Sequence, residues 1–362
     1  MAPSKLFQAL QATTTILTFC TTAHTAQPHT QADYQWSPLA SLPSGGRQEH
    51  AAIILCPDTI GVVGGITPNA SEKIPFSSTD LVQLYSIPEN TWRNVAPLPQ
   101  PLNHPNAIGV NGKIYVFGGF DDGDEESNIF HSVADSWVWD SATDHWTALS
   151  PLKPKRAQAV LGEYKGRIYM VGGLTDLVVS EAVPLPVTLT HVSVFDIATS
   201  SWVTDALPEV AKHLPEPRDH ARAEVIDGKM YVIGGVNAKF FNQNSAFILD
   251  LENLEAGWQR GAPMPTARST FGVGVVEGHK IVTIGGDGNV TETAALPTKI
   301  YDEVEVYDTR LNSWEQLAPL PKPGRQGPGV GVGGKVYVIG GYDTPPVGPL
   351  NRTDVFVLGS DA

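Results

Sequence analysis

The chain is patterned as short apolar runs separated by turn residues. In a representative stretch, the turn Asn111-Gly112-Lys113 is followed by Ile114–Gly119, where β-branched and aromatic residues end in a glycine pair. Runs of about four to eight such residues, bounded by glycine, asparagine or aspartate, are typical of β-strands. No helical periodicity of useful length accompanies them. The pattern therefore predicts an all-β protein built from antiparallel strands.

Two sequence markers recur with one period near 55 residues, which is typical of repeat architectures. Glycine pairs recur at intervals of 51 to 62 residues, and tryptophans recur at intervals of 54 or 56. In most units a third strand ends in an aromatic residue seven positions before the tryptophan; one unit departs, with Leu249 nine positions before Trp258. The pairs begin at Gly64, Gly118, Gly172, Gly234, Gly285 and Gly340, and the tryptophans are Trp36, Trp92, Trp146, Trp202, Trp258 and Trp314.

This order of glycine pair, aromatic residue and tryptophan resembles the kelch repeat, and it covers residues 36–358. The resemblance implies a six-bladed β-propeller whose blades each have four antiparallel strands. The last unit stops at Asp354–Leu358 without a tryptophan strand, whereas Trp36 has no strands of its own unit before it. The strand around Trp36 is therefore predicted to complete the sixth blade and close the ring, which removes open sheet edges.

Length alone would suggest two or three domains, but the single period predicts one propeller over residues 33–358, followed by a tail at 359–362. Residues 1–26 resemble a secretory signal peptide, with Lys5, an apolar stretch and small residues at a cleavage site within 23–26. A disordered or mitochondrial leader is the alternative. Residues 27–32 form a short leader. Cleavage would leave Cys56 as the single cysteine and exclude an intrachain disulfide.

Secretion also agrees with three glycosylation triplets, at Asn69, Asn289 and Asn351. We therefore expect a glycoprotein that is secreted or held in the lumen of the secretory pathway.

Composition and charge argue against several classes of binding partner and cofactor. A net charge of −14 without a basic run argues against binding of nucleic acid. No segment is long and apolar enough to predict a membrane span. The cysteines and the scattered histidines show no metal-ligand spacing, so we expect no metal and no cofactor. We expect a monomer. Glycine and proline make up about 18% of the chain, which suits a fold with many turns.

The predicted topology places the long connections on one face, called here the loop face. In an antiparallel blade, the loop from the second to the third strand lies on the same side as the start of the innermost strand. Long loops on a rigid scaffold commonly carry function, so a ligand or partner is expected on this face. The connections are 66–79, 120–134, 174–191, 287–301 and 342–352.

Five units place an arginine 15 to 17 residues before their glycine pair, where the innermost strand starts. These side chains are predicted to ring the mouth of the central channel, where guanidinium groups suit a carboxylate or phosphate. The alternative is structural, with each arginine bonded to backbone carbonyls or acidic side chains of adjoining blades. In kelch adaptors that recruit acidic peptides, arginines at matching positions bind the ligand. The arginines are Arg47, Arg156, Arg218, Arg268 and Arg325, and the second unit has Asn103 instead.

Histidines gather at the same junctions. His50, His104 and His220 complete the predicted ligand-binding set, and Glu49 and Asp219 adjoin two of them. A histidine beside a carboxylate at a pocket mouth can do acid–base chemistry. Solvated or hydrogen-bonded side chains are the plainer alternative. The catalytic candidates would be Arg218, Asp219, His220 and Arg268.

These features predict a kelch binding scaffold that recognises a polar or anionic ligand, either a small molecule or an acidic protein, in an Arg-lined central pocket. A cofactor-free isomerase, mutarotase or cyclase acting on a small molecule or sugar acid is the alternative, and an adhesion protein is a third. The chain resembles sialic-acid mutarotases in architecture and compartment only. Copper oxidases similar to galactose oxidase need a cysteine cross-linked to tyrosine, and Cys56 has no adjacent tyrosine, so no copper oxidase is expected.

Overall fold

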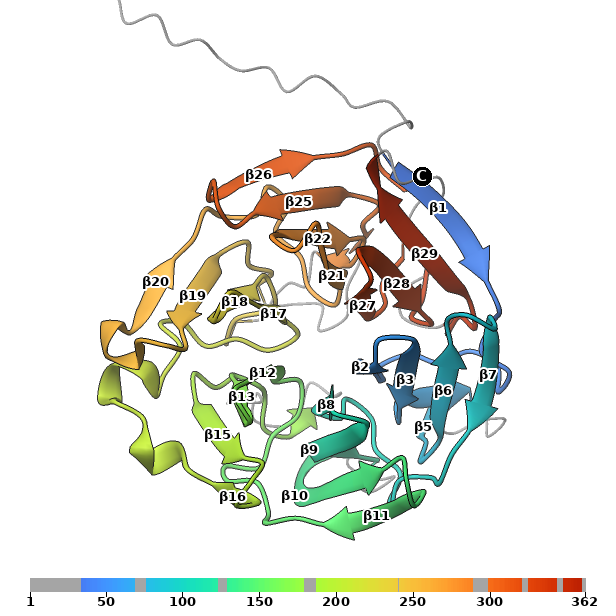
Figure 1. The fold of residues 1–362 in the computed structure, drawn as a ribbon, viewed down its shortest axis with the longest axis horizontal. Helices are drawn as coiled ribbons and strands as arrows, with labels where there is room; N and C mark the ends of the chain where they lie inside the picture. The colour runs from blue at the N-terminus through green and yellow to red at the C-terminus, as the bar shows by residue number, and fades with distance from the viewer. Residues whose placement is uncertain are drawn as a thin grey trace, which may run out of the picture.

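The computed structural model describes residues 34–359 except 69–75, 123–128, 179–186, 240, 289–298, 321–324 and 344–347. Six antiparallel sheets surround one axis (Figure 1). In each sheet four main strands lie side by side, from an innermost strand at the axis to an outermost strand at the rim. This arrangement confirms the predicted six-bladed propeller. The signal peptide and leader predicted for residues 1–32 lie outside the described residues.

Within blades 1 to 5 the strands lie in chain order from the axis outward, and in blade 6 the outermost strand is the first strand of the chain. Blade 1 has β2 (Ala51–Cys56), β3 (Thr59–Val63), β6 (Val82–Ser86) and β7 (Thr91–Asn94); blade 2 has β8 (Ala107–Val110), β9 (Lys113–Asp121), β10 (Ile129–Asp140) and β11 (His145–Ala148); blade 3 has β12 (Val160–Tyr164), β13 (Arg167–Val171), β15 (Val192–Asp196) and β16 (Ser201–Trp202). Blade 4 has β17 (Arg222–Ile226), β18 (Lys229–Ile233), β19 (Ala246–Asp250) and β20 (Trp258–Arg260); blade 5 has β21 (Gly272–Val276), β22 (Lys280–Ile284), β25 (Val304–Asp308) and β26 (Ser313–Gln316); blade 6 has β27 (Gly329–Val332), β28 (Lys335–Ile339), β29 (Thr353–Leu358) and β1 (Tyr34–Leu39).

Shorter elements lie in the connections. They are the strands β4 (Ile66–Pro68), β5 (Phe76–Ser78), β14 (Leu177–Val178), β23 (Asp287–Gly288) and β24 (Lys299–Ile300), and the 3₁₀ turns η2 (Thr204–Ala206), η3 (Glu209–Ala211) and η4 (Leu254–Ala256). The connection predicted at 120–134 is partly strand, because β9 and β10 continue their pairing as far as Asp121 and His131. Among the described residues, no helix has the length and apolar character needed to span a membrane.

The ring closes as the sequence predicts. Strand β1 pairs antiparallel with β29 over six residues, from Tyr34 opposite Leu358 to Leu39 opposite Thr353. Figure 1 shows β1 outside β29, so the first and last strands of the propeller share one blade. Tyr34 is buried against Phe356, with ring centroids 4.9 Å apart, and its hydroxyl donates to the carbonyl of Pro319 at 2.6 Å.

The six tryptophans that mark the repeat all lie on the outermost strands, whereas the chain's other two, Trp137 and Trp139, lie on β10. Four of the six donate their indole N–H to a carbonyl that follows the preceding blade's outermost strand: Trp92 to Ala40, Trp146 to Ala96, Trp202 to Ser150 and Trp314 to Ala262, at 2.8 to 3.1 Å. Each of these four tryptophans thus links two blades. Trp258, in the unit that departs from the pattern, has no such partner for its indole nitrogen.

The glycine pairs allow neighbouring blades to approach through their backbones. Gly285 has a φ of +61°, and a Cβ there would lie 2.2 Å from the carbonyl oxygen of Arg325 in the next blade. The N–H of Gly286 donates to that same oxygen at 2.9 Å. Any side chain at Gly285 would break this contact. Apolar side chains of adjacent blades fill the space further out, so the core lies between the blades, as with Tyr85 and Tyr337 of blades 1 and 6.

Candidate functional site

A cavity of about 320 Å³ runs along the axis, lined by the innermost strands β2, β8, β12, β17, β21 and β27. Its wall carries aliphatic side chains over much of its length, such as Ile53, Val160 and Val330. Its loop-face end is polar, with Glu49, His104, Gln158 and Gln326. The channel therefore has a polar mouth and a partly aliphatic interior.

The polar mouth is built by one repeated turn. In each blade, the residue after the arginine position forms a bridge with the residue that follows the glycine pair, as Asp219 does with Val236. In blade 2 the bridging residue is Asn103, so Leu102 occupies the arginine position and the prediction that Asn103 stands there was wrong by one residue. The next residue has a left-handed backbone, φ 49° to 53°, in blades 1 to 5, and in blades 1 to 3 it lines the cavity. These residues are Glu49, His104, Gln158, His220 and Thr270. Such a φ is uncommon outside glycine, which marks the turn as a special position.

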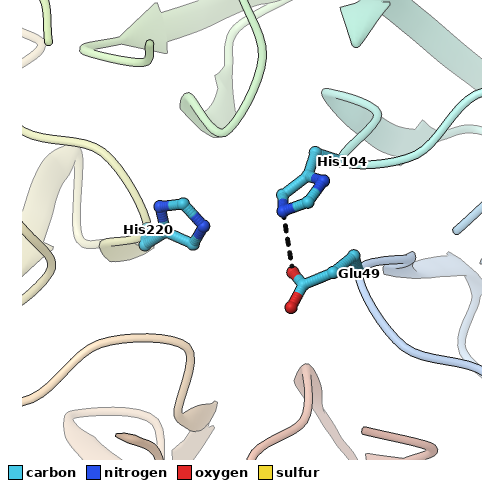
Figure 2. A group of neighbouring side chains, drawn as sticks. All are labelled: Glu49, His104 and His220. Atoms are coloured by element: carbon cyan, nitrogen blue, oxygen red, sulfur yellow. Dashed lines mark ion pairs between the residues drawn. The ribbon is translucent and has the colours of Figure 1, made fainter. Parts of the chain in front are cut away.

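Three of these turn residues converge across the channel (Figure 2). One ligating atom from each of Glu49, His104 and His220 lies within 4.8 Å of the others. His104 Nε2 is 3.1 Å from Glu49 Oε2, and the two imidazole centroids are 5.5 Å apart at an interplanar angle of 83°. The amides of Gln158 and Gln326 donate to the Glu49 carboxylate at 3.3 and 3.4 Å. We call Glu49, His104 and His220 the mouth triad.

Each imidazole of the triad is oriented by the residue before it. Asn103 Oδ1 lies 2.5 Å from His104 Nδ1, and Asp219 Oδ1 lies 2.5 Å from His220 Nδ1. Asn103 and Asp219 are themselves buried and bonded to Ser78 and Thr188. The imidazoles are therefore held by a second layer of polar groups.

The charges at the mouth depend on each other. Burial would raise the pKa of Glu49, but His104, His220 and Arg222 outweigh it and bring that pKa to about 2. Burial lowers the pKa of His104 despite the opposing influence of Glu49. Burial also tends to lower the pKa of His220, but the hydrogen bond to Asp219 and the charge of that carboxylate outweigh it, so the pKa of His220 is raised. Glu49 is thus ionised, and the two histidines differ in basicity.

Two charged residues that the sequence analysis did not single out lie on the channel wall. Arg222 and Glu224 alternate with Ala223 and Val225 along β17, and all four line the cavity. Arg222 donates to the carbonyls of Phe271 and Ala221 at 2.8 and 3.1 Å. Burial raises the pKa of Glu224 to about 7. The signal in the sequence is a charged pair two residues apart within an otherwise apolar inner strand.

Glu224→Gln is expected to stabilise the protein at pH 8 and to have little effect near pH 4. In the folded wild-type protein, burial raises the pKa of the Glu224 carboxyl from an ordinary 4.5 to about 7. Between those values the folded state keeps a proton that the unfolded state releases, so stability falls as pH rises through this window. Removing the carboxylate should then increase the free energy of unfolding by about 1–3 kcal/mol at pH 8. Urea denaturation at both pH values measures it, with exposed Glu255→Gln as the control; an unchanged midpoint at pH 8 would contradict the assignment.

The five predicted arginines do not line the cavity, and this corrects the Arg-lined pocket. Arg47, Arg156, Arg218, Arg268 and Arg325 are each at most 4% exposed. Their guanidinium groups donate inside the blades: Arg268 to the carbonyls of Gly285 and Glu303 and to Glu305, and Arg325 to the carbonyl of Gly340 and to Asp354. The physical reason is that blade interiors leave carbonyls and carboxylates that need donors. These side chains therefore have the structural role given above as the alternative, in which each arginine bonds to backbone carbonyls or acidic side chains.

The arginine and the glycine pair form one repeated clasp. The backbone carbonyl of the arginine accepts the second glycine N–H of the preceding blade, as in Gly173 to Arg218 and Gly341 to Arg47, both at 2.8 Å. In three blades the guanidinium then bonds the first glycine's carbonyl of its own blade, as Arg47 does with Gly64 at 3.1 Å. This explains why the two sequence features recur at a fixed spacing.

The other predicted residues lie in different environments. His50 lines the cavity, and burial together with the charge of Arg47 lowers its pKa to about 3. Asn103 is fully buried behind His104 and is not among the residues that line the cavity. Asn351 is exposed just before β29. Asn69 and Asn289 lie outside the described residues.

Comparisons with known proteins agree with the architecture. Residues 154–341 match the family model "KLHDC2/KLHL20/DRC7 Kelch-repeats domain", and residues 101–153 match the "Kelch motif" model. The chain is 33% identical over 317 residues to "Kelch-like protein terF" of Aspergillus terreus, covering 85% of this chain and 64% of that protein. It is 25% identical to human "Kelch domain-containing protein 3" (68% and 65%) and 21% identical to "Alpha-scruin" of Limulus polyphemus (75% and 28%). The chain spans less than two thirds of the length of each of these relatives.

Proposed function

The chain belongs to the kelch-repeat family, and from that premise we propose that it is a binding propeller that holds a small polar molecule at the loop-face mouth of its central channel. The observation that carries the proposal is the convergence of the mouth triad from blades 1, 2 and 4 at a cavity of about 320 Å³. Small-molecule sites are commonly concave, with volumes of about 300–1,000 Å³ and a few convergent polar groups.

The chemistry of the lining indicates the kind of molecule. Glu49 offers an anionic acceptor, the histidines offer imidazole nitrogens, and Gln158 and Gln326 offer amides. The wall beyond combines aliphatic side chains with the charged Arg222 and Glu224. A ligand with a hydroxyl, carbonyl or amine head and a small apolar body suits this arrangement. A strongly anionic ligand is disfavoured at the mouth, because the five arginines are engaged within the blades and the ionised Glu49 carboxylate stands there. Arg222 on the channel wall already donates to the carbonyls of Phe271 and Ala221.

The compartment is a further part of the proposal. The signal-like segment at 1–26 and the exposed Asn351 of an N-x-Thr triplet support entry into the secretory pathway. Expression in a secreting eukaryotic host provides the check: the protein should accumulate in the medium with a mature N-terminus just after cleavage within residues 23–26. Retention in the cytosol with an intact N-terminus would contradict it.

Affinity selection with mass spectrometry tests the binding proposal on this same material. Wild type, Glu49→Gln and the control Glu255→Gln are incubated with a pool of small polar metabolites in excess chelator, and the retained compounds are identified. At least one compound should be retained by wild type and by the control. Glu49→Gln should retain at least tenfold less of it, because that variant removes the negative charge at the mouth, to which Gln158 and Gln326 donate. Equal retention by all three proteins, or retention of nothing, would refute the channel site.

A second candidate function is acid–base isomerisation or cyclisation of the bound molecule. The Asp219–His220 contact at 2.5 Å favours it, since a carboxylate on Nδ1 makes Nε2 a better base. Arg218 and Arg268, also predicted as catalytic candidates, have no place in it, because both are buried within the blades. Conversion of a retained compound by wild type but not by His220→Gln would distinguish catalysis from binding alone.

A further inference from the structure

The hydrogen bonds behind His104 fix which of its nitrogens carries a proton. Ser78 donates its hydroxyl to Asp122, so Ser78 Oγ accepts from the Asn103 amide nitrogen at 2.8 Å. Asn103 Oδ1 must then face His104 Nδ1, 2.5 Å away, and Nδ1 must donate to it. The remaining nitrogen of a neutral His104, Nε2, carries a lone pair.

That lone pair faces another acceptor. His104 Nε2 lies 3.1 Å from Glu49 Oε2, so an imidazole lone pair and a carboxylate oxygen approach each other (Figure 2). Two acceptors at this distance repel unless a positive species lies between them, which must be a proton or a metal ion.

His220 is prepared in the same way from the other side of the channel. The Thr188 hydroxyl donates to Asp219 Oδ2 at 2.8 Å, and Asp219 Oδ1 accepts from His220 Nδ1 at 2.5 Å. In the neutral imidazole of His220, Nε2 therefore carries the lone pair that can bind a metal ion. A carboxylate or carbonyl on the far nitrogen is the usual outer partner of a metal-bound histidine, because it fixes the tautomer and the ring orientation.

We propose that Glu49, His104 Nε2 and His220 Nε2 bind one divalent transition-metal ion at the mouth of the channel, with Zn²⁺ as the reference ion. Two imidazoles and one carboxylate form a ligand set that suits such ions. Tetrahedral ligand atoms each about 2.0–2.2 Å from Zn²⁺ lie about 3.3–3.6 Å apart, and the His104–Glu49 distance of 3.1 Å is slightly shorter than that range. One ring nitrogen of His220 lies within 4.8 Å of the other two ligand atoms, so a shift of its side chain would complete the set.

The site would be of the open kind. Three protein ligands leave a coordination position for water or another molecule, and Glu49 and His104 both line the cavity, so that position faces the channel. The inference goes beyond the proposed function and does not depend on it, since the ion binds without any organic ligand. It revises the expectation of no metal, which rested on spacing along the chain; the three ligands come from three different blades.

Titration with metal alone tests the inference. Full-length protein, stripped with chelator and dialysed, is titrated with Zn²⁺ by calorimetry and with Co²⁺ by visible absorption. Wild type should bind one ion, and Co²⁺ should show d–d bands of a low-coordinate nitrogen–oxygen site. Glu49→Gln and His220→Gln should each lose at least tenfold in affinity. Asp219→Asn, which alters only the outer partner, should lose about 10–100-fold.

Controls separate this site from others. His145→Gln and Glu255→Gln change exposed residues of the same types and should bind like wild type. Thermal unfolding of wild type with and without Zn²⁺ needs no variant, and a rise in Tm that saturates at one equivalent supports the site. The absence of saturable binding to wild type, or affinity unchanged in both Glu49→Gln and His220→Gln, would overturn the inference and leave a proton between His104 and Glu49. Because organic ligands are tested in chelator, failure here leaves the binding proposal intact.

Discussion

Replacing Arg268 by methionine should lower the free energy of unfolding by about 3–5 kcal/mol, the usual cost of breaking a buried ion pair from one side. Both Arg268 and Glu305 have side chains that are 0% exposed, and they meet at 2.7 Å. Arg268 also donates to the carbonyls of Gly285 and Glu303 at 2.9 and 2.7 Å. Methionine fills part of the volume but leaves a buried carboxylate and two carbonyls without their donor. Urea denaturation at neutral pH measures the change.

The matched control is Arg260→Met. Arg260 also pairs with a glutamate, Glu216, but its side chain is 62% exposed, so its loss should cost about 1 kcal/mol or less. The double variant Arg268→Met with Glu305→Leu should recover part of the loss, because it removes the stranded charge. If Arg268→Met and Arg260→Met destabilise equally, Arg268 is not a structural clasp.

The arginines show where prediction from sequence reaches its limit. Their spacing to the glycine pairs correctly located the junctions on the loop face. It could not tell which side chain at each junction faces the channel. That choice depends on partners such as Thr283 and Glu305, which other strands of the same blade bring to Arg268. In blades 1 to 3 the residue two positions after the arginine position, in the left-handed turn, lines the mouth, whereas in blade 6 it is Gln326, directly after Arg325.

The mouth triad was predicted only in part, for a related reason. His104 and His220 were among the candidates, and Glu49 was noted as a neighbour of His50. Glu49 and His104 come from the neighbouring blades 1 and 2, and His220 of blade 4 meets them only when the blades surround one axis (Figure 1). Spacing along the chain carries no such information. The fold itself could be predicted, since its period, glycine pairs and tryptophans repeat in every unit and each copy supports the others.

Removing β1 should be the most damaging change to the ring. A chain that begins at residue 41 loses all six residue pairs with β29 and the buried Tyr34. Burial of one large aromatic side chain contributes about 1.5–3 kcal/mol, and β29 would become an exposed edge that invites aggregation. We expect a loss of about 5 kcal/mol or more, which lowers the Tm by roughly 10 °C or prevents recovery of monomer.

The comparison protein begins at residue 32, which keeps β1 and should unfold like the full chain. Both are followed by thermal unfolding and size-exclusion chromatography. A synthetic peptide of residues 32–41 added to the shortened chain should restore part of the lost Tm, because an isolated strand can pair with an open sheet edge. A peptide with Tyr34→Ala and Trp36→Ala should restore less, since it keeps the backbone but lacks the aromatic side chains that pack on Phe356 and its neighbours. If the shortened chain unfolds within about 2 °C of the longer one, closure by β1 does not stabilise the propeller.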